Sequence, residues 1–345
     1  MLAFWVLLLA GAAAQRPVII STDPGIDDSI ALLLALASPE LDVRAVCINF
    51  GSLHNTSQLA QNALDILALA GREDIPVFLG ATDPISQPFH DLGGPKFHGT
   101  DGLGGVRLPH SRATVNTSVS AVEFIVHACR SWQPAPLLVS LAPLTNVALA
   151  LNLDPKLPER CPDLFLMGGT VAAPGNVGPM SEANIANDPE AAARVLSAGF
   201  NTQVAALDVT MASWLPPKFL ASLRDLPNDA GPFIWQSTRF YERAYETIGG
   251  FEGGMPLHDP TTLLLYLKPE LYQLHRWPVT VDTSQYPSVS RGILVVDRRG
   301  GPKSPPPPDT DKVHFPMQVD VAGVQEFLLS RLRALPAGRL QILSE

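Results

Sequence analysis

Cysteine is scarce in this chain: the sequence contains three, Cys47, Cys129 and Cys161, among 345 residues. Three cysteines are too few for a domain held together by a disulfide framework, and they show neither the CxxC nor the Cys/His spacing of a zinc site. Each lies in or beside an apolar stretch. We therefore expect buried free thiols, with one disulfide as the alternative.

Positive charge is also limited. Lys and Arg number 24 against 33 Asp and Glu, which gives a formal net charge of −9. A groove for DNA or RNA needs concentrated Lys and Arg, so we expect no nucleic-acid partner, whereas a ligand of nucleoside size stays compatible. Hydrophobic residues make up 46% of the chain and charged residues 17%, a composition that excludes wholesale disorder and supplies a large core.

The apolar run at residues 1–14 is too short to span a bilayer. It ends in Ala12-Ala13-Ala14 before Gln15, which is typical of a signal-peptide cleavage site. We therefore predict a signal peptide at 1–14, a mature domain at 15–345, secretion, and no membrane contact after cleavage. Two sequons, which begin at Asn55 and Asn116, fit a glycosylated product.

Several motifs of common enzyme folds are missing. No GxGxxG opens a helix after a strand, and the sequence has neither a Walker loop nor a nucleophile elbow. Dinucleotide-binding, nucleoside-triphosphatase and serine-hydrolase functions would therefore lack the parts that perform them. No internal repeat is found either.

The chain does contain a regular alternation of β-branched and amphipathic segments. Strands are predicted to begin near residues 18, 43, 75, 136, 164 and 204, with helices between them at 57–71, 119–131, from 144, and 188–198. Such alternation implies a mainly parallel sheet covered on both faces. The Gly/Pro/His-rich segment from 80 to 114 is predicted to be a functional or disordered loop.

The pattern becomes more helical after about residue 212. Helices are predicted at 231–247, 259–267 and 321–334, strand-like pieces at 278–282 and 292–296, and an exposed polyproline loop at Pro305–Pro308. We expect one α/β domain, with an open, mainly parallel, doubly wound sheet, helices on both faces and a more helical C-terminal part.

Three carboxylates follow the first predicted strand. Asp23, Asp27 and Asp28 fall within six residues, between the run Val18–Ile20 and an apolar helical pattern. Ligands of open α/β sheets bind at the carboxyl ends of strands, and a hard divalent cation would relieve the mutual repulsion of three carboxylates. The alternative is a solvated helix N-terminus that the acidic residues cap.

Four later segments place polar groups where a strand should end or a turn should run. They are His98–Gly105, Leu141–Asn146, the set Asn176, Glu182 and Asn184, and the pair His258 and Asp259. Carbonyls after a strand could serve a metal, and close amide and carboxylate groups suit sugar hydroxyls. Taken singly, the same residues would also serve as helix caps, turn formers or surface groups.

Together these segments resemble the nucleoside hydrolases of the inosine–uridine-preferring family. The resemblance spans residue 17 to the C-terminal helix and includes, in order, Thr22–Asp28, His98–Gly104, Pro143–Asn146, Met167–Gly169, Gly175–Asn176, Glu182–Asn184, Asp188–Glu190 and His258–Pro260. It implies cleavage of the N-ribosidic bond of a small-molecule nucleoside, and a homodimer or homotetramer.

The resemblance also implies a set of ligands for one calcium ion. Asp23 and Asp28 would ligate from the opening loop, Leu141 through its backbone carbonyl, and Asp259 from the far end of the chain. Calcium accepts about six to eight oxygen ligands, so ribose hydroxyls and a water would fill the rest.

The remaining implied roles concern catalysis and substrate. Asp27 matches the general base that takes a proton from water, and His258 the histidine near the leaving base, a candidate acid. His98 belongs to the substrate pocket, and it or solvent could share the acid role. The other residues matched to substrate binding are Met167, Asn176, Glu182 and Asn184.

The chain departs from the family pattern at three places. Ser21 stands where the acidic motif usually begins with Asp, so metal affinity or loop geometry is in question. Ser52 replaces the usual Asn after Gly51, and Asn55 is a candidate substitute for that amide. Ala183 takes a position where some members carry an aromatic residue. Of the aromatic candidates to replace it, Trp235, Tyr241, Tyr245 and Phe251, we expect each to pack within helices.

We therefore expect a secreted, calcium-dependent nucleoside hydrolase. Two alternatives stay open: a hydrolase of another N-riboside such as nicotinamide riboside, and a catalytically weakened ribose- or nucleoside-binding protein. A base beside the metal argues against the second, because binding alone does not need one.

Overall fold

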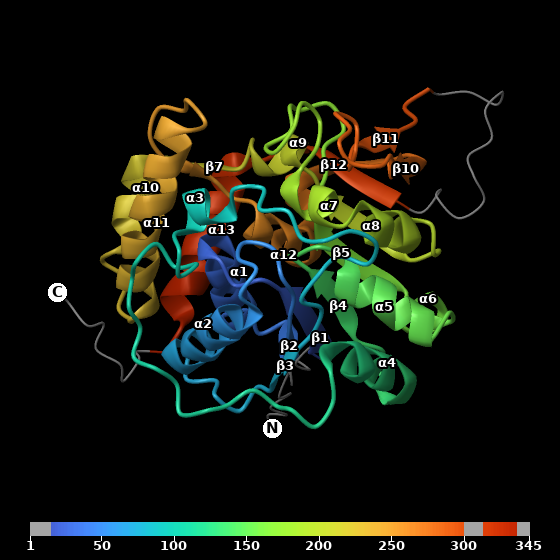
Figure 1. Cartoon of the computed structure of the whole chain (residues 1–345). Helices are drawn as coiled ribbons and strands as arrows, with labels where there is room; N and C mark the ends of the chain where they lie inside the picture. Colours follow the sequence, from blue (N-terminus) through green and yellow to red (C-terminus); the bar gives the residue numbers. More distant parts are fainter. Residues whose placement is uncertain (1–14, 300–312, 337–345) are drawn as a thin grey trace, which may run out of the picture.

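A central sheet of eight strands runs through the computed structural model, which describes residues 15–299 and 313–336 (Figure 1). The predicted signal peptide and polyproline loop lie outside the described residues. In spatial order the strands are β3 (Val77–Leu79), β2 (Leu41–Ile48), β1 (Arg16–Thr22), β4 (Leu137–Ser140), β5 (Asp163–Met167), β6 (Asn201–Ala205), β12 (Val313–Val319) and β9 (Tyr272–Arg276).

The strand order reverses direction at β1. From β1 the chain builds outward through β2 to β3, then returns to pair β4 on the other side of β1. All neighbours in the sheet are parallel except β9, which pairs antiparallel with β12 at the edge. The carboxyl ends of β1 and β4 thus form a topological switch point, where open α/β sheets bind ligands.

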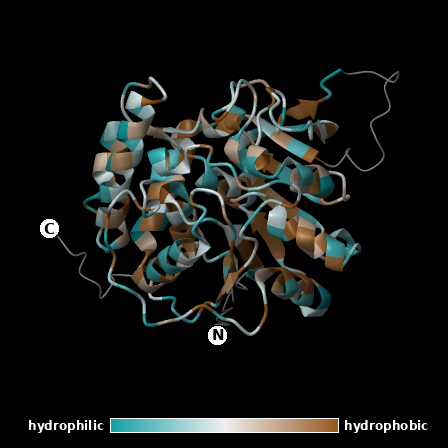
Figure 2. Cartoon of the chain, in the orientation of Figure 1, coloured by the Kyte–Doolittle hydropathy of each residue, from teal (hydrophilic) through white to brown (hydrophobic). Residues whose placement is uncertain are grey.

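Alternate residues of β1 enter two separate cores. Val18 and Ile20 pack on one face of the sheet, and Ile19 packs on the other. The first face is covered by α1 (Ile26–Leu36), α2 (Thr56–Leu69), α11 (Ala230–Thr247), α12 (Asp259–Leu267) and α13 (Val321–Ala334); the second by α4 (Ala121–Ser131), α5 (Thr145–Leu153) and α8 (Pro189–Leu196). The central strands are correspondingly apolar in Figure 2. This confirms the predicted doubly wound α/β domain.

Shorter elements complete the fold. The segment from 80 to 114 contains one helix, α3 (Gly94–His98). The others are α6 (Leu157–Arg160), α7 (Ala183–Asn187), α9 (Leu207–Thr210), α10 (Pro217–Leu223), the 3₁₀ turn Pro269–Leu271, and the strand pairs β7 (Trp214–Leu215) with β8 (Met255–Pro256) and β10 (Val279–Val281) with β11 (Leu294–Val296). Among the described residues, no helix combines the length and apolar character needed to cross a bilayer.

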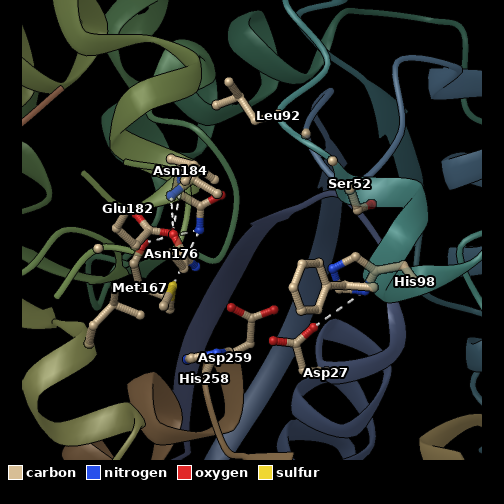
Figure 3. A pocket seen from close by; sticks show the side chains of 18 of the residues that line it. Asp27, Ser52, Leu92, His98, Met167, Asn176, Glu182, Asn184, His258 and Asp259 are labelled. Atoms are coloured by element: carbon tan, nitrogen blue, oxygen red, sulfur yellow. Dashed lines mark hydrogen bonds and ion pairs between the residues drawn. The ribbon is translucent and has the colours of Figure 1, made fainter. Parts of the chain in front are cut away.

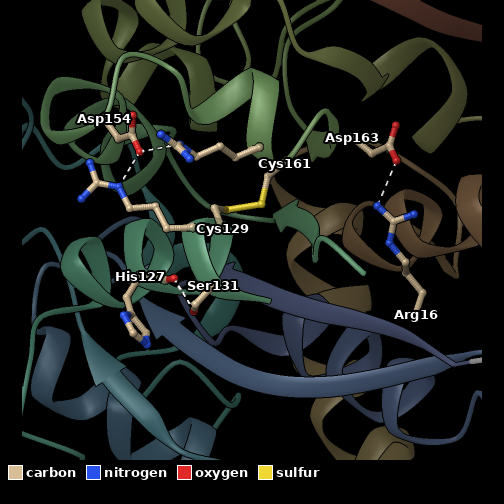
Figure 4. The surroundings of a disulfide bond; sticks show 9 residues. Arg16, His127, Cys129, Ser131, Asp154, Cys161 and Asp163 are labelled. Carbon is tan, nitrogen blue, oxygen red and sulfur yellow. Dashed lines mark hydrogen bonds and ion pairs between the residues drawn. A yellow bond between two sulfur atoms is a disulfide. The ribbon is translucent and has the colours of Figure 1, made fainter. Parts of the chain in front are cut away.

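The expectation of three free thiols was wrong for two of them. Cys129, on α4, forms a disulfide with Cys161, which directly follows α6 (Figure 4). Cys47 is buried and free. The bonded cysteines are 32 positions apart and carry no local pairing signal, because it is the packing of α4 beside α6 that brings the two sulfurs together.

Candidate active site

A cavity of about 600 Å³ opens at the carboxyl ends of β1 and β4. All eleven site residues predicted from the sequence line it: Asp23, Asp27, Asp28, His98, Leu141, Met167, Asn176, Glu182, Asn184, His258 and Asp259. Figure 3 shows Asp27 and Asp259 pointing toward one another, with Glu182 and Asn184 on a separate wall. The switch point therefore gathers residues from both ends of the chain.

Three carboxylates form the floor of the cavity. The side-chain oxygens of Asp27, Asp28 and Asp259 lie within 4.8 Å of one another, and all three residues are buried. Asp28 is fixed locally, because its carboxylate accepts hydrogen bonds from the Thr22 hydroxyl and from Gly25 N (3.0 Å). Asp259 arrives on the first turn of α12, which packs against α1.

Burial and mutual repulsion oppose ionisation of this floor. Burial raises the pKa of Asp27 to about 6. Burial, and then the charges of the neighbouring aspartates, raise the pKa of Asp28 and hold that of Asp259 well above its usual range. Among residues 15–299 and 313–336, no lysine or arginine lines the cavity. Buried, clustered carboxylates without a basic partner fit a hard divalent cation, so the floor is a possible metal site.

Asp23 and Leu141 border this floor without joining the three-carboxylate cluster. The Asp23 carboxylate accepts a hydrogen bond from Ser52 N, and burial, followed by the charge of Asp28, raises its pKa well above the usual range. The Leu141 carbonyl accepts a hydrogen bond from Asn184 Nδ2 at 2.7 Å. A carbonyl oxygen has two lone pairs, so this bond leaves one for a cation.

The two serines that depart from the family pattern have structural partners. Ser52 donates its hydroxyl to the backbone oxygen of Asp23 (2.5 Å) and so fixes the opening loop. Ser21 accepts a hydrogen bond from Asn146 Nδ2 (3.1 Å), and Asn146 Oδ1 in turn accepts from Ala81 N (2.8 Å). Through Asn146, Ser21 thus helps to hold the segment that follows β3. Asn55 lies outside the cavity lining and caps α2, so it does not replace the missing amide.

The polar wall opposite the floor is hydrogen-bonded to backbone. Glu182 caps α7: its carboxylate accepts from the amides of Asn184 (2.9 Å), Ile185 (3.2 Å) and Gly169 (2.8 Å). Burial nevertheless raises the pKa of Glu182 to about 7. Asn176 accepts from Ala183 N (3.0 Å). Most of the hydrogen-bonding capacity of this wall is therefore used within the protein.

His98 lies on α3 against the floor. Its Nδ1 accepts a hydrogen bond from Ile26 N (3.2 Å) and lies 3.8 Å from Asp27 Oδ1. Burial lowers the pKa of His98 to about 4. The imidazole is therefore neutral near pH 7, with its proton on Nε2.

Three of the aromatic residues expected to serve only helix packing belong to the cavity. Tyr241 and Tyr245, four residues apart on α11, line it together with Phe251. The Tyr241 hydroxyl donates to Asp27 Oδ2 (3.4 Å). Trp235 is outside the cavity, beneath the guanidinium of Arg224. The packing interpretation is confirmed for Tyr241 and Tyr245, which are buried in the core on α11, but it missed that they also line the cavity. It was wrong for Phe251, which lies beyond the end of α11 and is partly exposed.

His258 is buried between two hydroxyl groups. Its Nδ1 is 2.7 Å from the Thr210 hydroxyl, and its Nε2 is 2.6 Å from the Tyr245 hydroxyl. Burial lowers the pKa of His258 to about 3, so it is neutral near pH 7. The imidazole therefore carries one N–H, and both of its nitrogens are engaged by hydroxyl groups.

Comparison with known proteins identifies the family to which this fold and cavity belong. The model of the family "Inosine-uridine preferring nucleoside hydrolase" matches residues 18–326. A pyrimidine-specific ribonucleoside hydrolase of Klebsiella pneumoniae is 36% identical over 283 residues, which cover 81% of this chain and 88% of that protein. An uncharacterized protein of Schizosaccharomyces pombe is 36% identical over 320 residues, covering 92% and 99%.

Solved structures agree. A plant nucleoside hydrolase superposes with a TM-score of 0.85 at 30% identity, covering 93% of this chain and all of that one. A purine-preferring ribonucleoside hydrolase from Gardnerella vaginalis gives 0.84 at 30% identity, covering 93% and 99%. The fold and the site thus define an N-ribosyl hydrolase, an enzyme that cleaves ribonucleosides. The chain belongs to the inosine–uridine-preferring nucleoside hydrolase family.

Proposed function

We propose that this enzyme hydrolyses the N-glycosidic bond of ribonucleosides to free base and ribose in a calcium-dependent reaction, with Asp27 as the general base. The observation that carries the proposal is the buried cluster of Asp27, Asp28 and Asp259 on the cavity floor. Three clustered carboxylates without a cation would only destabilise the fold, so we infer that they are retained for binding and chemistry.

The proposed calcium ligands are Asp28 and Asp259 on the floor, with Asp23 and the Leu141 carbonyl, which border it in the same cavity. Hard oxygen donors of this kind suit calcium better than softer transition metals. When bound, the cation would supply positive charge that offsets the carboxylates and would lower the pKa of a nearby water.

Asp27 is proposed to accept the proton of the attacking water. A pKa of about 6 leaves it ionised at neutral pH yet basic enough to take a proton, which is the range that general-base catalysis favours. The hydrogen bond from Tyr241 orients its carboxylate. The bond from water oxygen to the ribose C1′ forms as the bond from C1′ to the base nitrogen breaks, through an oxocarbenium-like sugar.

The wall of Met167, Asn176, Glu182 and Asn184 is proposed to hold the ribose. The lining also includes the apolar residues Leu92, Phe97, Met211, Ile248 and Phe251, of which Phe97 and Phe251 form an apolar end against Tyr245. We assign the nucleobase to this apolar end, where His258 and Tyr245 are the polar groups that could direct a proton to it.

The test is base release from a panel of purine and pyrimidine ribonucleosides, before and after exhaustive chelation. We expect chelation by EGTA to abolish release and added calcium to restore it, while EGTA presaturated with calcium has no effect. Full activity after chelation would overturn the metal assignment. Restoration by magnesium but not by calcium would keep the site and replace the ion.

A further inference from the structure

We propose that Asn116 carries an N-linked glycan, so that the chain matures in the secretory pathway. Asn116 is exposed in the loop before α4 and begins the sequon Asn116-Thr117-Ser118. Its Oδ1 accepts hydrogen bonds from Ser118 N (3.0 Å) and from the Ser118 hydroxyl (2.6 Å). The hydroxyl of the sequon is therefore already turned toward the acceptor side chain.

The proposed modification uses the atom that these bonds leave untouched. A bond forms between Asn116 Nδ2 and the anomeric carbon of an oligosaccharide as that carbon's bond to a lipid diphosphate donor breaks. Nδ2 loses one proton, and the lipid diphosphate is the leaving group. Oδ1 keeps its two hydrogen bonds from Ser118, so the folded loop accommodates the product without losing a contact.

The disulfide is an independent indication of the same compartment. Cys129 and Cys161 are bonded, and such bonds form and persist in oxidising compartments such as the lumen of the secretory pathway. N-glycosylation of sequons takes place in that lumen. Cys129 lies on α4, the helix that directly follows the Asn116 loop.

The position of Asn116 is compatible with catalysis. Its backbone N–H donates to Val77 O (2.8 Å), at the amino end of β3, whereas the cavity lies at the carboxyl ends of the strands. In addition, β3 forms an edge of the main sheet. Edge strands can pair with other chains, and a glycan beside β3 would block that approach.

Asn55 provides a contrast within the same chain. Its side chain caps α2, where Oδ1 accepts from Gln58 N (3.2 Å), and Thr56 and Ser57 are already helical. The preceding loop contacts the segment that leads to the cavity, since His54 stacks on Phe89 with ring centroids 4.4 Å apart. The Asn55 side chain is thus engaged by the helix and not by the sequon hydroxyl, whereas Ser118 bonds to Asn116, so we assign the modification to Asn116.

The experiment is secretion of the full chain from a eukaryotic cell line, followed by intact and peptide mass spectrometry with and without peptide N-glycosidase. We expect the wild-type chain in the medium to carry a glycan on the Asn116 peptide. Asn116→Gln and Ser118→Ala should each remove it. Thr117→Ala, which keeps the acceptor and the hydroxyl, should leave it in place, and Asn55→Gln reports the other sequon separately.

An unmodified Asn116 in secreted protein would overturn the proposal, and so would a chain that stays inside the cell with Asn116 unmodified. Should Asn116→Gln fail to accumulate, comparison of Ser118→Ala with Thr117→Ala still tests whether Asn116 is glycosylated. Removing the glycan enzymatically from folded wild-type protein should change base release by less than about twofold, because the glycan is remote from the reacting atoms.

Discussion

The floor and the polar wall of the cavity differ in how their buried polar groups are compensated. On the floor, Asp27, Asp28 and Asp259 face one another, and burial opposes the charge of each. On the opposite wall, Glu182 and Asn176 are equally close to the ligand space but are hydrogen-bonded to backbone amides. Burial raises the pKa of carboxylates on both sides, but the floor carboxylates also repel one another, whereas Glu182 is held by three backbone amides.

This difference indicates which residues serve the reaction and which hold the structure around it. The backbone hydrogen bonds of Glu182 hold the start of α7 whether or not a ligand is present, and they offset part of the cost of its burial. A cluster of carboxylates that repel one another costs stability until something positive binds, so its retention requires a role in binding or reaction. Mutations on the floor should therefore act mainly on turnover, and mutations on the wall should act on stability and KM together.

The largest expected effect is that of Asp27→Asn. The substitution keeps the shape of the side chain but removes the proton acceptor, so kcat should fall by about 10²–10⁴-fold with a much smaller change in KM. Steady-state release of free base measures it. The control is Asp65→Asn, which changes a buried carboxylate on α2 that lies outside the cavity lining. Turnover of Asp27→Asn within tenfold of wild type would remove Asp27 as the base.

The next effect is a pH dependence of stability in chelator. Because the pKa of Asp27 is about 6 in the fold against a usual 3.8, its contribution is fully present below pH 4 and is lost as the pH rises through about 6. A shift of this size corresponds to about 3 kcal/mol. The raised pKa values of Asp23, Asp28, Asp259 and Glu182 act in the same direction, whereas the lowered pKa values of His98 and His258 act in the opposite direction.

Thermal unfolding between pH 4 and 7 checks this expectation. In chelator, the Tm of the wild type should fall relative to that of Asp27→Asn as the pH rises, because the opposing contributions of His98 and His258 are common to both proteins. The increase in Tm on adding calcium should grow over the same range. Asp259→Asn should diminish both trends. A calcium-induced change in Tm that is constant across the range would contradict the mutual repulsion of the floor carboxylates.

A smaller effect is expected on the wall. Glu182→Ala removes the acceptor of three backbone amides, so it should lower the free energy of unfolding by about 1–2 kcal/mol and raise KM. The matched control is Ser120→Ala, which removes the cap of α4 far from the cavity and should lower stability alone. If Glu182→Ala changes KM no more than Ser120→Ala does, the wall is purely structural.

The smallest effect concerns Ser21. Ser21→Ala removes the hydrogen bond that Asn146 donates, at a cost of about 0.5–1.5 kcal/mol in unfolding free energy, and should leave the calcium requirement unchanged. Ser140→Ala, at the paired position of β4, is the control. A tenfold change in the calcium concentration for half-maximal activity in Ser21→Ala alone would place Ser21 near the cation.

Most of the sheet could be predicted because its strands are buried on both faces and separated by amphipathic helices. The strands β9 and β12 were missed for identifiable reasons. In β9, Tyr272 is buried but the next four residues are exposed, so it lacks an apolar run. In β12, a proline at 316 interrupts the apolar pattern, and the strand follows the polyproline segment.

The site was predictable as a set of residues but not as a network. The residues that the collinear motifs single out line one cavity, because they sit at strand ends and helix starts. The contacts of Tyr241 with Asp27, 214 positions apart, and of Asn146 with Ser21, 125 positions apart, depend on tertiary packing alone. The same holds for the pairing of Cys129 with Cys161.

The packing of α1 against α12 has a consequence for the order in which the enzyme becomes active. Asp27 and Asp28 are synthesised early, whereas Asp259 is made after the whole β1–β6 part of the sheet. A nascent chain that has folded only its first half holds two of the three floor carboxylates. The three-carboxylate floor is therefore completed only after Asp259 has been synthesised. Catalytic activity thus requires that α12 has packed against α1.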